Sequence, residues 1–125
     1  MIEIHPLRDK EKLSVIYKAA NTEFGENSMA VIAADGDEVL GNCLFDMNDD
    51  SLLIRHLEPE SDKFFADGIL RSALHVGVEN GKMTAFYSET APSELFSALG
   101  FIKNAENREL NVEKLFSSCQ KCSNT

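Results

Sequence analysis

The sequence predicts an α/β domain in which a mixed, twisted sheet carries helices on both faces. Three observations predict this fold class. Apolar residues recur at helical spacing in three segments, strand-like runs separate those segments, and a meander of three strands precedes a strand–helix–strand unit. The chain has 125 residues, a length that suits one domain. We expect that domain at residues 1–116 and a polar tail at 117–125.

The first half of the chain predicts one helix and four strands. Apolar residues at helical spacing predict a helix over residues 9–24, which Gly25 ends. Asp35-Gly36-Asp37 is typical of a hairpin turn, so the strands on either side of it should pair antiparallel. The strands, which are rich in β-branched and other apolar residues, are expected at residues 2–7, 29–34, 39–45 and 52–57.

The second half predicts two helices and the strands that complete the sheet. An apolar stripe from Phe65 to Val76 indicates a helix that Ser61 or Asp62 caps at its start. A shorter helix begins near Pro92 and ends at Gly100. Strands are expected at residues 83–87, 101–102 and 110–116.

The charge of the chain limits its partners. Twelve Lys and Arg residues against 21 Asp and Glu residues give a formal charge of −9, whereas nucleic acids and anionic membranes bind to concentrated basic surfaces. No apolar run approaches the roughly 20 residues of a membrane span, and the first residues lack the pattern of a signal peptide. The sequence therefore predicts a cytoplasmic protein with no nucleic-acid or membrane partner.

The cysteines do not form a recognisable framework. Cys43, Cys119 and Cys122 are too few for a disulfide scaffold. Cys119 and Cys122 have the spacing of half a zinc site, but no second Cys or His pair completes it. We expect reduced thiols in a frayed end and no metal, with a metal or redox role for this pair as the alternative.

Two segments carry a resemblance to a known family. Asp67-Gly68-Ile69-Leu70-Arg71-Ser72-Ala73-Leu74 is similar to the acyl-CoA pyrophosphate loop and following helix of the GNAT superfamily of N-acyltransferases. Leu95-Phe96-Ser97-Ala98-Leu99-Gly100-Phe101 resembles the late helix of that family, which typically ends in Leu-Gly-Phe. The order of elements matches as well, so the resemblance covers nearly the whole chain. It implies a GNAT-like fold and acyl transfer from acyl-CoA to an amine.

The resemblance also implies a cofactor site, with acetyl-CoA as the co-substrate. In the family, a loop of the pattern Gln/Arg-x-x-Gly-x-Gly/Ala and the following helix N-terminus hold the pyrophosphate through backbone N–H groups. The pattern falls here on Phe65, Gly68 and Leu70, of which Gly68 alone matches. The implied cofactor-binding residues are Leu57, Phe65, Ala66, Asp67, Gly68, Ile69 and Arg71. The alternative is a well-capped core helix, because Glu60, Asp62 and Asp67 would repel a diphosphate and would satisfy the helix N-terminus themselves.

Two side chains are candidates for moving the reaction's proton. Strand alternation places His56 on one face with Leu52 and Ile54, and imidazole titrates near neutrality, so His56 is the candidate general base. Tyr87, at the end of the next strand, is the candidate acid, because the family's frequent Tyr is replaced here by Phe96. The alternatives are a hydrogen-bonded structural histidine and a packed tyrosine with a solvated hydroxyl.

Two classes of function follow from these features. The first is a GNAT-like N-acetyltransferase that acts on a small-molecule or peptide amine, and the acidic chain favours a cationic acceptor. The second is a GNAT-fold domain that has lost turnover and binds a ligand or a protein, which the departures from the family's motifs favour. The architecture also admits a homodimer in which a second copy completes the terminal strand.

Overall fold

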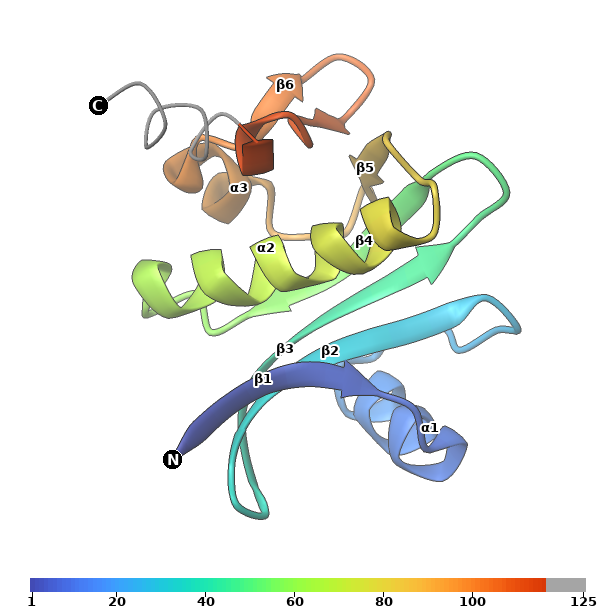
Figure 1. The fold of residues 1–125 in the computed structure, drawn as a ribbon, viewed down its shortest axis with the longest axis vertical. Helices are drawn as coiled ribbons and strands as arrows, with labels where there is room; N and C mark the ends of the chain where they lie inside the picture. Colours follow the sequence, from blue (N-terminus) through green and yellow to red (C-terminus); the bar gives the residue numbers. More distant parts are fainter. Residues whose placement is uncertain (117–125) are drawn as a thin grey trace.

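The computed structural model describes residues 1–116, which form three helices and one mixed sheet of seven strands (Figure 1). The helices are α1 (Lys10–Ala19), α2 (Lys63–Glu79) and α3 (Ser93–Leu99). The strands are β1 (Ile2–Leu7), β2 (Ser28–Asp35), β3 (Glu38–Met47), β4 (Leu52–Glu58), β5 (Ala85–Tyr87), β6 (Ile102–Asn104) and β7 (Glu109–Leu110). The predicted polar tail, with Cys119 and Cys122, lies outside the described residues.

The strand order in the sheet is β1-β2-β3-β4-β5-β7-β6. Strands β1 to β4 pair antiparallel, and Gly36 turns the β2–β3 hairpin with a positive φ of 63°. The crossover through α2 makes β5 parallel to β4, and β7 then inserts antiparallel between β5 and β6. The predicted meander and mixed sheet are therefore confirmed.

Apolar residues are buried on both faces of the sheet. In β2, Val31 and Ala33 pack into the cluster beneath α2 and α3, whereas Ala30 and Ile32 pack into the cluster beneath α1. Successive side chains of a strand point to opposite faces, so a strand covered on both sides is apolar throughout. The prediction of helices on both faces is confirmed.

The helix predicted for residues 9–24 is shorter than expected. It ends at Ala19, and Asn21 adopts a left-handed conformation with φ 53°, which asparagine tolerates better than most residues. Phe24 continued the helical stripe in the sequence, yet it packs against Tyr17 from the following loop, with ring centroids 5.3 Å apart. Phe24 is therefore apolar because it packs against Tyr17, and not because the helix extends to residue 24.

The C-terminal strands were also predicted too long. The strand expected at 83–87 covers only residues 85–87. The strand expected at 101–102 is observed as β6, at residues 102–104. The strand expected at 110–116 is wrong beyond Leu110, because residues 114–116 form a helical turn. Val112 and Leu115 are three residues apart, which is helical spacing, and both contribute to the cluster beneath α2 and α3.

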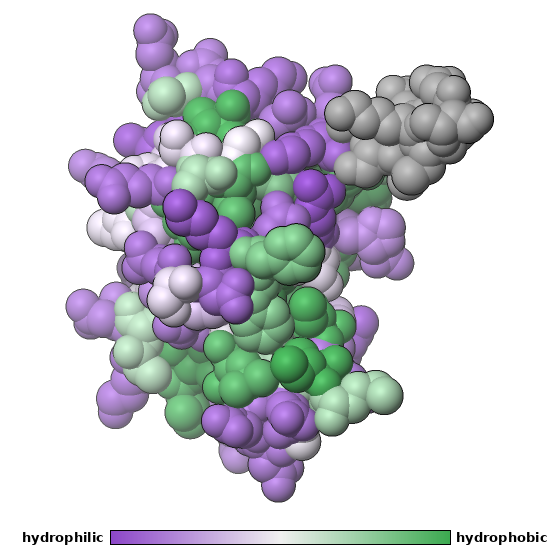
Figure 2. Space-filling view, turned by 90° about the vertical axis from the view of Figure 1, so that its left-hand side faces the viewer, coloured by the Kyte–Doolittle hydropathy of each residue, from purple (hydrophilic) through white to green (hydrophobic). Residues whose placement is uncertain are grey.

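An apolar area lies at the surface beside the edge strand β1. Ile2 is 52% exposed and Ile4 is 37% exposed, and Phe64, in the first turn of α2, is 92% exposed. A β-carbon built at Gly68, one turn after Phe64, would lie 3.6 Å from Ile4 Cδ1, so α2 passes next to β1. Figure 2 faces this side of the molecule and shows an apolar area among mostly hydrophilic side chains.

Two glycines of α2 sit in contrasting surroundings. A β-carbon at Gly77 would lie 2.5 Å from Leu52 Cδ1, and Leu52 is 1% exposed and has little room to move. At Gly68 the nearest atom is at ordinary contact distance. Gly77 therefore sets how closely α2 approaches β4, whereas Gly68 leaves space for a methyl group.

We predict opposite effects of alanine at these two positions. Gly68→Ala should raise the free energy of unfolding by about 0.5–1 kcal/mol, because alanine loses less backbone entropy in a helix. Gly77→Ala should lower it by about 1–3 kcal/mol, because the helix must move away from Leu52. Urea unfolding of both variants measures the difference, and an equally stable Gly77→Ala variant would contradict the assigned contact.

Candidate functional site

Strand β4 contains a bulge at Arg55. Its register with β3 pairs Phe45 with Ile54 and Leu44 with His56, so Arg55 has no partner residue on β3. An extra residue in one strand reverses the alternation of the side chains that follow it. The bulge therefore decides which face of the sheet the end of β4 presents to each helix.

The bulge corrects the predicted position of His56. Leu52 and Ile54 belong to the cluster beneath α2, and so does Leu57, which strict alternation would place on the other face. His56 instead lines a hollow of about 460 Å³ on the α1 side, with Ile16 among the α1 residues of its wall. The prediction that His56 shares a face with Leu52 and Ile54 is wrong.

Strands β4 and β5 separate immediately before His56. Their pairing ends at Ile54 and Tyr87, and the Ser88 N–H closes it by donating to the Ile54 carbonyl over 2.8 Å. Strand β4 continues to Glu58 and pairs there with β3 alone. Residues 55–58 therefore have no partner strand on the β5 side in the described part of the chain.

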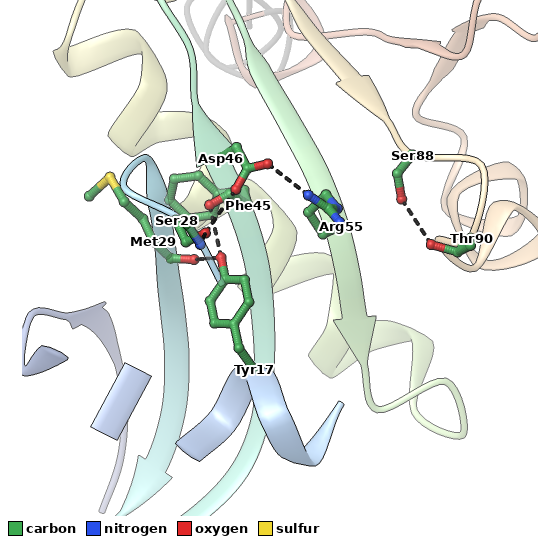
Figure 3. A network of polar contacts seen from close by, with 9 residues as sticks. Tyr17, Ser28, Met29, Phe45, Asp46, Arg55, Ser88 and Thr90 are labelled. Atoms are coloured by element: carbon green, nitrogen blue, oxygen red, sulfur yellow. Dashed lines mark hydrogen bonds and ion pairs between the residues drawn. The ribbon is translucent and has the colours of Figure 1, made fainter. Parts of the chain in front are cut away.

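A chain of polar contacts ties the bulge to its neighbours (Figure 3). Arg55 Nη1 donates to Asp46 Oδ2 over 2.9 Å, and Ser28 Oγ donates to Asp46 Oδ1 over 3.1 Å. The side chains of Arg55 and Asp46 are 23% and 17% exposed, so solvent screens this ion pair less than a pair on the open surface. The contacts hold Arg55 out of the core and fix the bulge against β3.

Tyr17 joins α1 to strands β2 and β3 at the same level of the sheet. Its hydroxyl lies 2.5 Å from the Met29 carbonyl and 3.0 Å from the Phe45 carbonyl, as Figure 3 also shows. Burial raises the pKa of Tyr17 well above its ordinary value, so the hydroxyl stays protonated and remains a donor. One hydroxyl thus serves two backbone acceptors beside the bulge.

Three polar side chains meet in the hollow on the α1 side. Glu58 Oε1 accepts a hydrogen bond from Asn42 Nδ2 over 2.7 Å and lies 3.6 Å from His56 Nε2. Asn42 is 6% exposed, and its Oδ1 atom is buried without a hydrogen-bond partner among residues 1–116. The hollow therefore offers the Glu58 carboxylate as an acceptor, and the C-terminal end of α1 forms part of its wall.

Tyr87 lies on the opposite face from His56. It is 5% exposed, belongs to the cluster beneath α2 and α3, and packs on Phe96 with ring centroids 5.2 Å apart. No hydrogen bond joins its hydroxyl to another residue of the described range. The structure places both candidates next to the point where β4 and β5 separate, but the sheet lies between them.

The predicted pyrophosphate loop is helical. α2 begins at Lys63, and the Asp62 side chain caps it by accepting from the Phe65 N–H over 3.1 Å. The loop implied around Gly68 is therefore wrong, because Gly68 lies in the second turn, where N–H groups bond within the helix, and the alternative of a capped helix is confirmed. The N–H groups of the first turn belong to Lys63, Phe64 and Phe65.

The other predicted cofactor-binding residues lie along α2 and at the end of β4. Leu57, Ala66 and Ile69 are fully buried. Arg71 Nε donates to Asp67 Oδ2 over 2.7 Å, and the guanidinium of Arg71 lies 5.2 Å from the centroid of the Phe101 ring. Arg71 therefore interacts within the fold, where Asp67 balances its charge.

Two further features bear on the kind of site. In the part of the chain that the structure describes, no three His, Cys, Asp or Glu side chains are arranged to hold a metal ion. No helix within residues 1–116 is both long and apolar enough to cross a membrane. Cys43 is buried, and burial raises the pKa of its thiol, which keeps the thiol protonated.

Solved structures resemble this fold despite low sequence identity. The ribosomal-protein-S18-alanine N-acetyltransferase of Escherichia coli aligns with a TM-score of 0.57 and 14% identity over 87% of this chain and 88% of that chain. The chain has the GNAT fold. A GNAT-family acetyltransferase from Streptococcus pneumoniae aligns with a TM-score of 0.54 and 20% identity, over 81% and 87% of the two chains. A GNAT-family protein from Desulfovibrio desulfuricans aligns with a TM-score of 0.57 and 10% identity, over 80% of this chain and 83% of that chain.

No protein-family model matches the sequence, and no curated protein does. The GNAT fold predicted from element order is thus confirmed by structure alone. Sequence reasoning missed Asn42 and Arg55, which the fold brings to the site. Opposite charges at Asp46 and Arg55 were the one signal for the bulge, since they flank a turn between two predicted strands.

We predict that the two buried tyrosines differ in their contribution to stability. Tyr17→Phe should lower the free energy of unfolding by about 1–3 kcal/mol, because buried carbonyls lose their donor. Tyr87→Phe should change it by less than about 0.5 kcal/mol, because its hydroxyl has no partner within residues 1–116. Denaturant unfolding compares the two variants. Equal losses of unfolding free energy would show that the hydrogen bonds of the Tyr17 hydroxyl do not add to stability.

Proposed function

We propose that this protein is an N-acyltransferase that moves an acyl group from acyl-CoA, with acetyl-CoA as the donor, to a primary amine. The observation that carries the proposal is the separation of β4 from β5 next to the N-terminus of α2. The pantetheine arm of CoA is an extended chain with two amides. Such a chain can pair with the unpartnered backbone edge of residues 55–58 as an added strand would.

The N-terminus of α2 is the proposed binding site for the diphosphate of CoA. The first-turn N–H groups of Lys63 and Phe64 and the Lys63 ammonium favour an anion there. Glu60 and Asp62 oppose it, and Asp62 already occupies one N–H group of the same turn. The site thus combines a favourable backbone with unfavourable side chains, and we expect weak CoA binding.

The acceptor amine is assigned to the α1 side of the opening. His56 would take a proton from the ammonium, and the neutral nitrogen would then attack the thioester carbonyl carbon. An amide bond forms as the C–S bond breaks, and the attacking nitrogen releases its second proton to water. The CoA thiolate leaves and takes a proton from Tyr87 or from water, so that free CoA and the amide are the products. The exposed Glu58 carboxylate supplies an acceptor for the amine's N–H groups.

The acceptor is proposed to be a cationic small-molecule or peptide amine. The carboxylate of Glu58, the C-terminal end of α1 and the overall charge of −9 attract cations. The Escherichia coli neighbour is named for an alanine of ribosomal protein S18, which places peptide amines among the acceptors to test. Release of free CoA from acetyl-CoA is the readout, with a polyamine, a lysine peptide and a peptide that begins with alanine as acceptors.

We predict that His56→Gln lowers kcat by about 100-fold while the KM for acetyl-CoA changes little, because a general base acts in the chemical step. His75→Gln is the matched control, since His75 is exposed on α2 and lies 3.7 Å from Glu79. Its kcat should equal that of the unmodified protein. Equal turnover in the His56→Gln variant would exclude His56 as the base.

We predict that Asp62→Asn strengthens CoA binding about five- to tenfold. Asparagine keeps an oxygen that can cap α2 but removes one negative charge next to the diphosphate. Asp9→Asn makes the same change at the cap of α1, where no diphosphate is expected, and should leave CoA binding unchanged. Thermal shift measures both, since ligand at a hundredfold excess over its Kd adds about 2.7 kcal/mol.

The absence of any shift with millimolar CoA, in both the unmodified protein and Asp62→Asn, would contradict the acyltransferase proposal. A domain that keeps the GNAT fold and binds another ligand or a protein would then be the remaining function.

A further inference from the structure

The apolar area beside β1 requires an explanation, because β1 is the edge of the sheet. Ile2, Ile4 and Phe64, which we call the edge patch, contribute large exposed apolar side chains where α2 passes β1. Figure 2 shows an apolar area on this side of the molecule. Beyond β1 no further strand is present among residues 1–116, so its outer backbone groups have no strand partner. An exposed edge with apolar side chains is a template for another strand.

We propose that a second copy of this chain covers the edge patch by pairing its β1 antiparallel with the first β1. The two sheets then become continuous, and a two-fold axis passes between the two strands at Ile4. In such a symmetric contact the same surface is used twice, so it must complement itself. The sequence of β1 meets this requirement.

The residues around Ile4 are self-complementary in charge. Antiparallel pairing about Ile4 places Glu3 opposite the partner's His5 and, by symmetry, His5 opposite the partner's Glu3. In a single copy, neither Glu3 nor His5 forms an ion pair with another residue of the range 1–116, and both side chains are exposed. A copy of this chain therefore brings an acid–imidazole pair to each side of the axis, although the chain as a whole carries a charge of −9.

The opposite face of the same strand supplies the apolar contact. Ile4 meets the Ile4 side chain of its partner, and Ile2 meets the partner's Pro6, which contributes apolar contact but no N–H to the strand pairing. Phe64 projects from α2 one turn before Gly68, whose β-carbon position lies 3.6 Å from Ile4 Cδ1. The two Phe64 rings therefore flank the paired isoleucines and can close over them.

The size of this contact indicates a reversible dimer. One strand pair and three apolar side chains from each copy form a small interface, so we expect a dissociation constant in roughly the micromolar range. Sedimentation of the full chain over a micromolar concentration series measures it. A protein that stays monomeric throughout that series would overturn the proposal.

Variants locate the contact. Ile4→Glu should weaken dimerisation at least about 100-fold, because two like charges meet at the axis. Met83→Glu is the matched control, since Met83 is 55% exposed between α2 and β5, with three strands between β5 and β1 in the sheet, and its dimer should be unchanged. Circular dichroism verifies that both variants are folded. Equal dissociation constants in the two variants would overturn the assignment of the interface to β1.

A charge exchange tests the register. Glu3→Lys should weaken the dimer about tenfold, and Glu3→Lys combined with His5→Glu should restore it, because the pair is then reversed and not lost. A register that does not centre on Ile4 would give no recovery in the double variant, and that result would overturn the proposed pairing. These measurements do not depend on acyl transfer.

Discussion

The bulge at Arg55 is the constraint on which the candidate site depends. Without the extra residue, Leu57 would leave the core beneath α2, and His56 would take its place there. A buried imidazole in that cluster would have no polar neighbour comparable to Glu58. With the bulge, residues 52–57 fill the core on one face of the sheet and present the His56 side chain on the other face.

Polar contacts hold this bulge where apolar packing alone would not. Asp46 ties Arg55 to β3, and Tyr17 anchors α1 across β2 and β3 by serving two carbonyls. A half-buried ion pair and a shared buried hydroxyl are sensitive to geometry, so they favour one register over its neighbours. The position of His56 therefore depends on residues that are distant in sequence and belong to three other elements.

The sequence was informative where structure depends on neighbouring residues. Gly100 ends α3 in the left-handed conformation with φ 74°, and Asp62 caps α2, as predicted. The face of His56 could not be predicted, because a bulge arises from pairing between strands and no short window contains both partners. Gly68 was placed in a phosphate loop on the resemblance of its segment, although the acidic cap already marked a helix start at Lys63.

The insertion of β7 between β5 and β6 has a consequence for biosynthesis. The strand made last among those described, Glu109–Leu110, occupies an interior position of the sheet, and the Arg108 carbonyl accepts from the Tyr87 N–H over 2.9 Å. When only residues 1–100 have emerged from the ribosome, β5 still lacks the strand β7 that pairs with its outer edge. The residues after 100 that complete the packing around α3 are also still missing. Closure of this half of the sheet must wait until translation has passed Leu110.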